Sequence, residues 1–170
     1  MTFFIMKYLK TTIFSFLILL FSSTTFGQFT EEDFTDNLYY SAGITFHNQK
    51  FAELGIGYAF IGEWGNMGSN NLFLGLKFAT EFNIEGKKRI VAPKVSAEIN
   101  MLCLGTRFNF INYTDLTYND VKFTPEVGIT ALGYCNLFYG YNFSLSKSHF
   151  DFVPRNRLTL VVNFGKGFLK

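Results

Sequence analysis

The feature that most constrains the fold of this chain is a regular alternation between large apolar residues and small or polar ones. It is clearest from Asn71 to Asn83, which reads Asn-Leu-Phe-Leu-Gly-Leu-Lys-Phe-Ala-Thr-Glu-Phe-Asn. A period of two residues is typical of a β-strand, whose successive side chains point to opposite faces, and it does not fit a helix. One face of this segment is therefore apolar, and the other carries Gly75, Lys77 and Glu81.

The alternation recurs along the chain from Leu38 onward. It predicts eight strands of about ten residues each, within residues 38–46, 52–60, 71–83, 91–99, 102–110, 123–131, 135–145 and 158–164. A change of parity predicts tight turns near residues 100–102 and at Gly133. Strands of this length span a bilayer when they are tilted by about 45°. The predicted fold class is all-β, an eight-stranded antiparallel up-and-down transmembrane β-barrel.

The first residues of the chain have the features of a cleaved signal peptide. Lys7 and Lys10 precede an apolar run from Ile13 to Phe21, and small residues suit cleavage after Gly27. The apolar run is shorter than the roughly 20 residues that a membrane-spanning helix needs. The expected organisation of the chain is a signal peptide over residues 1–27, a polar N-terminal lead-in over residues 28–37 and an outer-membrane β-barrel over residues 38–170.

The mature chain is expected to have no excess of charge. Cleavage after Gly27 removes two of the 15 basic residues and none of the 13 acidic ones, so the formal net charge falls from +2 to zero. A neutral chain gives no support for binding to nucleic acid. Cys103 and Cys135 form no Cys-x-x-Cys motif and are expected to be free thiols, on the polar and the apolar face respectively. We expect neither a metal nor a cofactor.

Two kinds of barrel fit this apolar pattern, and they differ in whether the apolar face points inward or outward. A soluble lipocalin-like barrel would enclose an apolar cavity lined by Leu72, Leu74, Phe108 and Leu137, whereas a membrane barrel would turn its apolar face outward. The opposite face distinguishes the two, because it carries seven glycines: Gly43, Gly55, Gly57, Gly75, Gly105, Gly128 and Gly140. Glycine weakens a strand that faces water, but in a narrow lumen it leaves room for long side chains. The glycines therefore favour a polar face turned inward.

The charged residues within the strands lie on the same face as the glycines. There are four of each sign, and we predict that they form a charge network in the lumen: Glu53, Lys77, Glu81, Lys94, Glu98, Arg107, Glu126 and Arg157. Buried charges are tolerated only if they pair, and the equal numbers permit pairing. Phe138, Asn109 and Asn142 are expected to fill the remaining space.

Aromatic residues near the ends of the predicted strands are typical of the girdles that membrane proteins place at the interface with water. The candidates for such girdles are Tyr39, Tyr40, Phe60, Trp64, Phe82, Tyr113, Phe123, Tyr134, Phe150 and Phe152.

Three segments resemble a known class of protein. Residues 123–129 (Phe-Thr-Pro-Glu-Val-Gly-Ile), Gly133 and residues 136–142 (Asn-Leu-Phe-Tyr-Gly-Tyr-Asn) resemble the closing strands of small outer-membrane barrels of Bacteroidetes-type bacteria. In architecture the chain is similar to the eight-stranded outer-membrane protein A and X barrels. The resemblance implies a monomer in outer-membrane lipid, whose last strand is recognised by the insertion machinery through a final aromatic residue. In this chain the alternation ends at Phe164, and six more residues follow.

The expected function is that of an integral outer-membrane barrel with a closed, charge-filled lumen and a structural or surface-interaction role. Its surface loops would be residues 62–70, 114–120 and 146–154. One alternative is a narrow small-solute pore, gated by rearrangement of pairs such as Glu126 with Arg107. The other alternative is the soluble lipocalin-like binding barrel.

We do not expect an enzyme. The only histidines are His47 and His149, and a nucleophilic hydrolase would need an activated Ser with a His and an acid. Ser148, His149 and Asp151 are neighbours in the sequence, but neighbouring positions do not by themselves form a triad.

Overall fold

The computed structural model describes residues 34–62, 72–85, 89–131, 133–146, 150 and 153–165, and these residues form β-strands joined by turns and loops. The strands are β1 (Phe34–Phe46), β2 (Lys50–Gly62), β3 (Leu72–Asn83), β4 (Val91–Met101), β5 (Leu104–Thr114), β6 (Asn119–Ala131), β7 (Cys135–Tyr141), β8 (Phe143–Ser144) and β9 (Asn156–Phe164). Among the described residues, no helix is long and apolar enough to cross a membrane. The predicted signal peptide lies outside them.

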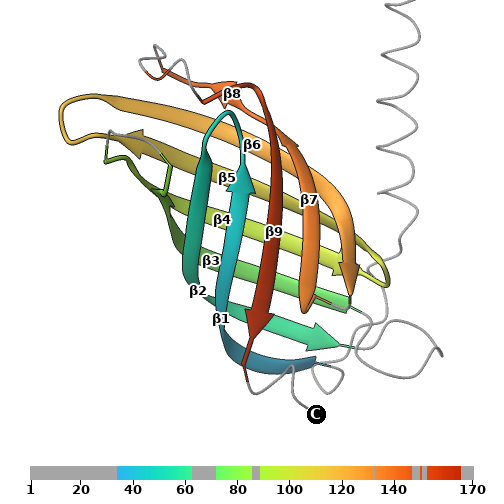
Figure 1. Cartoon of the computed structure of the whole chain (residues 1–170). Coiled ribbons are helices and arrows are strands. Elements are labelled where there is room, and N and C mark those ends of the chain that lie inside the picture. Colours follow the sequence, from blue (N-terminus) through green and yellow to red (C-terminus); the bar gives the residue numbers. More distant parts are fainter. Residues whose placement is uncertain are drawn as a thin grey trace, which may run out of the picture. The chain divides into compact units, whose positions relative to one another are not determined.

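The strands close into a barrel (Figure 1). Their order in the sheet is β5-β4-β3-β2-β1-β9-β7-β6-β8, and a further pairing joins β5 to β6. The short β8 follows β7 after Asn142 and pairs with the same neighbour, β6, so β7 and β8 act as one interrupted strand. Every pairing is antiparallel, and β1 closes the barrel against β9. The predicted eight-stranded antiparallel up-and-down barrel is therefore confirmed.

Two strands begin four residues earlier than the alternation predicts, and β2 and β9 begin two residues earlier. β1 starts at Phe34 and pairs along its whole length with β2, so residues 34–37 belong to the barrel and not to the predicted polar lead-in. β6 starts at Asn119, inside the predicted loop over residues 114–120. In both places polar residues continue a strand beyond its apolar part, because pairing with a long neighbouring strand supplies their backbone hydrogen bonds.

The parity changes mark turns, as predicted. Met101 pairs with Leu104, so the tight turn consists of Leu102 and Cys103, with Leu102 at a φ of 55°. Both cysteines are free and exposed, as expected for the thiols, but Cys103 lies in this turn and not on the polar face of a strand. Gly133, at a φ of 82°, lies in the connection between β6 and β7, where only glycine adopts this backbone conformation without strain.

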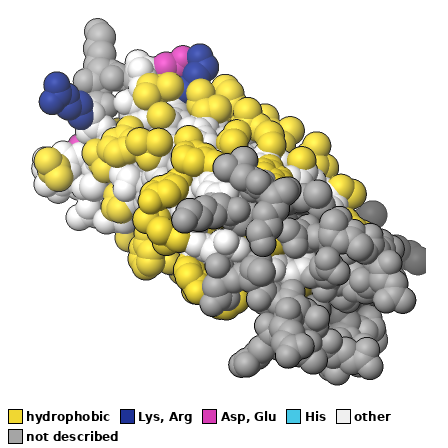
Figure 2. All heavy atoms as spheres, turned by 90° about the horizontal axis from the view of Figure 1, so that it is seen from below, with side chains coloured by type: hydrophobic (Ala, Val, Ile, Leu, Met, Phe, Trp, Pro, Cys, Tyr) yellow, Lys and Arg dark blue, Asp and Glu magenta, His cyan; other side chains and the backbone are white. Residues whose placement is uncertain are grey.

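The apolar face of the barrel points outward and the polar face points inward. Leu76, Phe78 and Leu104 expose 62%, 66% and 63% of their surface, whereas all eight charges of the predicted network are buried. Figure 2 shows hydrophobic side chains spread over one face of the molecule, with charged groups gathered at one end. Phe108 and Leu137 are also exposed, so the apolar cavity predicted for the soluble alternative is not formed by these residues.

Inward-facing glycines make room for aromatic rings. A Cβ atom on Gly75 would lie 2.7 Å from Phe73 Cε1 and 3.1 Å from the Tyr39 hydroxyl, and one on Gly57 would overlap the Tyr39 ring. The Tyr39 and Phe73 rings meet edge to face at 5.5 Å between centroids. The prediction that the glycines leave space for large side chains in the lumen is therefore confirmed at these positions.

Three aromatic residues assigned to the girdles lie inside the barrel instead. Tyr39, Tyr113 and Phe150 are buried, so they fill the lumen and cannot reach a membrane interface. Tyr40, Phe60 and Phe82 are exposed on the outer face, as a girdle requires, and Phe123 and Tyr134 are partly exposed. Trp64 and Phe152 lie outside the described residues. Proximity to a strand end did not reveal which face an aromatic residue occupies, whereas parity would have placed Tyr39 and Tyr113 inside.

The packing of Phe73 on Gly75 predicts a specific coupling. Gly75→Ala is expected to lower the free energy of unfolding by about 1–3 kcal/mol, because the new methyl group overlaps the Phe73 ring. Chemical denaturation followed by circular dichroism measures this loss. Phe73→Leu serves as the control, and the double variant should be destabilised by less than the sum of the two single changes. Strictly additive losses would contradict this account of the glycine.

Candidate functional site

The charged residues predicted from the sequence meet in the middle of the lumen. Six strands contribute them, namely β2 (Glu53), β3 (Lys77, Glu81), β4 (Lys94, Glu98), β5 (Arg107), β6 (Glu126) and β9 (Arg157). Each residue exposes no more than 3% of its surface. We call this set the lumen charge network. The alternation positions it, because each of these residues has the inward parity of its strand.

The centre of the lumen charge network is a pair of like charges. Glu53 and Glu81 lie directly opposite each other on β2 and β3, an arrangement that is unfavourable without a counter-charge. Lys94 reaches across from β4 and places its Nζ 2.5 Å from Glu53 Oε2 and 2.7 Å from Glu81 Oε1. Lys77 adds a second cation, 2.8 Å from Glu53 Oε1. Lys94 therefore acts as a clamp between the two carboxylates.

Two arginines extend the network around the barrel. Arg107 Nη2 lies 2.5 Å from Glu126 Oε2, and Arg157 Nε lies 3.0 Å from Glu126 Oε1. Arg157 also pairs with Glu81 through Nη2, and Arg107 Nη1 approaches Glu53 Oε1 at 3.9 Å. The Arg107 guanidinium packs over the Phe138 ring at 4.6 Å from its centroid. The contacts close a ring of alternating sign that runs Glu53, Lys94, Glu81, Arg157, Glu126 and Arg107.

Glu98 is buried with the others but stands apart from this ring. It lies directly opposite Arg107 on the neighbouring strand, yet Arg107 pairs with Glu126 on its other side. Among the described residues, the hydrogen bond of Glu98 comes from the Asn100 side-chain amide, at 2.7 Å to Oε1. The ring with Lys77 holds four cations and three carboxylates, so Glu98 supplies the charge that balances them. The prediction that all eight charges face the lumen is confirmed, and seven of them are joined by ion pairs.

Sequence reasoning missed two further charges in the lumen. Asp120 and Lys122 are buried, and their side chains lie 3.3 Å apart at the start of β6. Lys122 Nζ also donates to the Val153 carbonyl at 3.3 Å. Both residues share the inward parity of Thr124 and Glu126, and this parity could have identified them. The predicted loop included Asp120, however, and the predicted strand began only at Phe123. With this pair the buried charges of the described lumen number five of each sign.

Apolar clusters lie beyond the charges at both ends of the barrel. At the end of the barrel where β1 begins and β9 ends, Tyr39, Ala59, Ile61 and Phe73 pack together with the partly buried Tyr134. At the opposite end a larger cluster contains Phe51, Ile90, Ala92, Ile111, Tyr113, Phe150 and Val153. Ile90, Phe150 and Val153 come from connections between strands, so loops as well as strands fill that end. Asn109, Phe138 and Asn142 are buried in the lumen, as predicted.

His47 borders the lumen charge network at the end of the barrel where β1 meets β2 in a turn. It lies in the turn between β1 and β2, where its ring meets Phe51 edge to face at 5.5 Å between centroids. Tyr113 links it to the charges, with its hydroxyl 3.4 Å from His47 Nε2 and 3.4 Å from Glu81 Oε2. Burial, and next the nearby Arg157 guanidinium, lower the pKa of His47 from 6.5 to about 3. The imidazole is therefore neutral at physiological pH.

The arrangement is an electrostatically balanced set of buried charges, most of them held in ion pairs. Arg157 also donates hydrogen bonds to the hydroxyl groups of Thr45 and Tyr113, at 2.9 and 3.1 Å. Within the part of the chain that the structure describes, no group of three His, Cys, Asp or Glu side chains is placed to hold a metal ion. Ser148, His149 and Asp151 lie outside the described residues.

Comparison with known proteins adds no family assignment. No protein-family model matches the sequence, and no curated protein is significantly similar to it. Of the resemblance described above, the structure shows the closed eight-stranded antiparallel barrel.

Removal of the Lys94 clamp is expected to destabilise the folded protein strongly. Lys94→Met leaves Glu53 and Glu81 facing each other in the lumen and should lower the free energy of unfolding by about 3–5 kcal/mol. Lys50→Met is the matched control, because Lys50 pairs with Glu85 on the surface, and it should leave stability unchanged within error. Adding Glu81→Gln to Lys94→Met should recover part of the loss. Equal effects at Lys50 and Lys94, measured by denaturant unfolding, would refute the clamp.

His47 predicts a pH dependence of stability. Its pKa is lower in the folded chain than in the unfolded chain, so between pH 6.5 and about 3 the unfolded state binds the extra proton. Stability should therefore fall as the pH drops through this range, with a contribution from His47 of about 1–3 kcal/mol. Unfolding curves of the wild type and of His47→Gln, recorded over this range, isolate the contribution. Parallel pH profiles for the two proteins would contradict the burial of a neutral imidazole.

Proposed function

We propose that this protein is an integral outer-membrane β-barrel with a closed lumen and a structural or surface-interaction role. The observation that carries the proposal is the inverted distribution of side chains. Large apolar residues cover the outer wall, while the buried charges of the described lumen balance at five of each sign. Among the described strand side chains from Asn37 onward, Lys50 is the one charged group that is exposed, and it lies at the rim, in the first position of β2.

Membrane lipid accounts for this distribution in physical terms. Soluble monomers rarely expose continuous apolar patches larger than a few hundred Å². Here exposed apolar residues recur on every long strand, including Tyr40, Leu54, Leu76, Val95 and Phe108. In a bilayer the same wall is favourable, because each backbone polar group of the closed sheet can bond to a neighbouring strand. A charged side chain facing lipid at mid-bilayer would instead cost about 2–4 kcal/mol.

The topology supports an orientation for the barrel. With an even number of strands, the start of β1 and the end of β9 lie toward the same rim, and Phe164, the last residue of β9, pairs with Tyr40 of β1. An N-terminal export signal would deliver that rim to the periplasmic side. The Leu102–Cys103 turn and the connection between β6 and β7 belong to this rim and are short. The opposite rim, which includes the connection between β8 and β9, would face the outside of the cell.

A closed lumen favours a structural or surface-interaction role over the small-solute pore. Apolar clusters lie across both ends of the described lumen, and the ring of ion pairs lies between them. A conducting path would require Arg107 to leave Glu126 inside a narrow bore, and separating a buried ion pair costs about 3–5 kcal/mol. Contacts with partners would therefore form at the rims or on the outer wall.

A charge placed on the outer wall tests the proposal. Leu76→Arg should destabilise a membrane-inserted barrel by about 2–4 kcal/mol, because Leu76 is exposed near the middle of β3. Ile84→Arg is the matched control, since Ile84 is equally apolar and exposed but lies in the connection between β3 and β4. The readout is electrophoresis of boiled and unboiled membrane fractions after carbonate washing. Wild type and Ile84→Arg should stay in the membrane with heat-dependent mobility, and Leu76→Arg should do so in reduced amount.

Recovery of the wild type from the soluble periplasmic fraction would overturn the proposal. In that case the outer wall must be covered by something other than lipid. Leu76→Arg would then be expected to improve solubility.

A further inference from the structure

The two cysteines lie at the same rim of the barrel, on opposite sides of one strand. Cys103 is the second residue of the tight turn between β4 and β5, and Cys135 is the first residue of β7. The strand between them is β6, because it pairs with β5 on one side and with β7 on the other (Figure 1). Both thiols are free and exposed.

Backbone hydrogen bonds fix both cysteines in place. The Cys103 carbonyl accepts a hydrogen bond from the Thr130 N–H group at 2.9 Å, which ties the turn to β6. Cys135 pairs with Ala131 on β6 and with Val162 on β9. Because Thr130 and Ala131 are successive residues of β6, the cysteines flank nearly the same point of that strand from its two sides.

This placement excludes a disulfide between the two cysteines. Neighbouring strands lie about 4.8 Å apart, and two such spacings separate the Cα atoms of Cys103 and Cys135 by about 9–10 Å. A disulfide joins Cα atoms that are about 4.4–6.8 Å apart. One of the cysteines would therefore have to leave its place beside β6, so the disulfide and the closed barrel are mutually exclusive.

The unfolded chain has no such restriction. The segment between the two cysteines contains β5 and β6, and a flexible segment of that length closes into a loop at modest entropic cost. In the reaction the two thiols become a disulfide, while the disulfide of an oxidant takes up their two electrons and two protons and becomes two thiols. The bridge would hold the start of β7 beside the β4–β5 turn and away from the edge of β6 with which it pairs.

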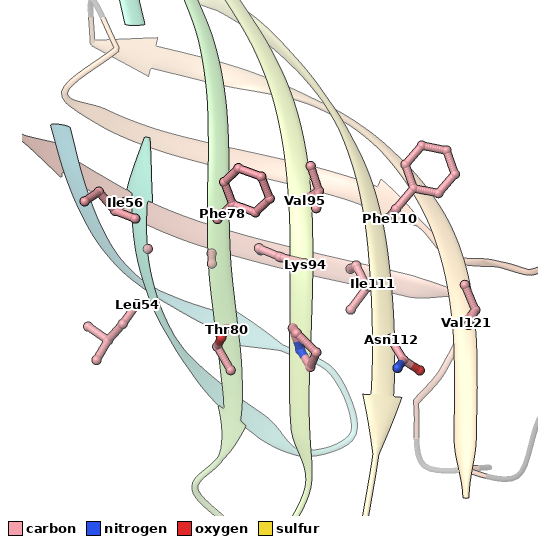
Figure 3. A pocket seen from close by; sticks show the side chains of 13 residues that line it. Leu54, Ile56, Phe78, Thr80, Lys94, Val95, Phe110, Ile111, Asn112 and Val121 are labelled. Carbon is pink, nitrogen blue, oxygen red and sulfur yellow. The ribbon is translucent and has the colours of Figure 1, made fainter. Parts of the chain in front are cut away.

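The thiols are open to other proteins at the rim. The depression in the outer wall lies elsewhere, and neither cysteine lines it (Figure 3). Its members on β5 are Phe110, Ile111 and Asn112, near the end of that strand, whereas Cys103 precedes the start of β5. A thiol or disulfide of another protein can therefore reach the cysteines without entering a pocket.

We propose that the barrel assembles only from the dithiol form of the chain, and that a Cys103–Cys135 disulfide blocks assembly until a dithiol reductant removes it. The inference rests on the proposed function, because an outer-membrane protein passes unfolded through the periplasm, where disulfides form and persist. The reductant supplies two electrons and two protons and is itself oxidised to a disulfide. The reaction that must precede assembly of an oxidised chain is thus thiol–disulfide exchange.

The test compares folding of the reduced and the internally bridged forms of the mature chain. The bridged form is made in urea with oxidised glutathione and isolated as a monomer, and both forms are diluted into detergent micelles. The reduced chain should gain a mobility that changes on boiling. The bridged chain should lack this heat-modifiable band until dithiothreitol is added. A heat-modifiable barrel that retains the disulfide would overturn the inference.

A relocated bridge provides the matched control. Ala131 lies directly opposite Cys135, and directly opposed residues of antiparallel strands have Cα atoms about 4.5–5.5 Å apart, which suits a disulfide. The double variant Cys103→Ser, Ala131→Cys should therefore become heat-modifiable in its bridged form. Cys135→Ser alone cannot form an internal bridge and should fold equally well with and without the oxidant. If the relocated bridge blocked folding as completely as the original one, the geometric argument would be wrong.

Labelling in cells separates this inference from the proposed function. Outer-membrane fractions are treated, without reductant, with a maleimide coupled to polyethylene glycol. The heat-modifiable wild type should accept two labels, and Cys103→Ser should accept one. A membrane-inserted, heat-modifiable wild type that carries the internal disulfide, and so accepts labels only after reduction, would overturn the inference and leave the membrane barrel standing. Recovery of the wild type from the soluble periplasmic fraction would overturn both.

Discussion

The structure depends on a repulsion that is neutralised inside a narrow lumen. Glu53 and Glu81 face each other across two neighbouring strands, and the Lys94 ammonium group between them removes the conflict. Because the lumen is narrow, the side chains that satisfy these charges must also fill its volume. Glycine on the same face makes space for rings, and apolar clusters at both ends separate the ion pairs from water. The same side chains must therefore satisfy both the packing and the charge balance of the lumen.

Much of this organisation could be predicted from the alternation alone. Parity identified the strands, the outward and inward faces, the eight charges of the network and the role of the glycines. It failed where a local rule replaced it: Tyr39 and Tyr113 were assigned by their distance from a strand end, Asp120 was assigned to a loop, and Lys122 was assigned to no strand. In each case the parity of the strand would have given the observed side. When strands are long, proximity to a turn is a poor predictor of the face that a side chain occupies.

Which cation meets which carboxylate could not be predicted, for a physical reason. Parity indicates which face a side chain occupies. Its partners across the lumen depend on the stagger between strands, which a single sequence does not determine. Arg107 has an acid opposite it on each neighbouring strand and pairs with Glu126 rather than Glu98.

The position of Arg157 has a consequence for how the chain folds. It lies on β9, the last strand, and contacts Glu81, Glu126 and Thr45, the last of these 112 residues earlier in the chain. Until β9 docks against β1, the two carboxylates lack one of their cations and the sheet has two open edges. Pairing of β9 with β1 therefore completes the backbone hydrogen bonds of the sheet and the neutralisation of the lumen charges in the same event. Such coupling makes assembly cooperative, and it penalises any intermediate in which the cylinder has nearly formed but the last strand is missing.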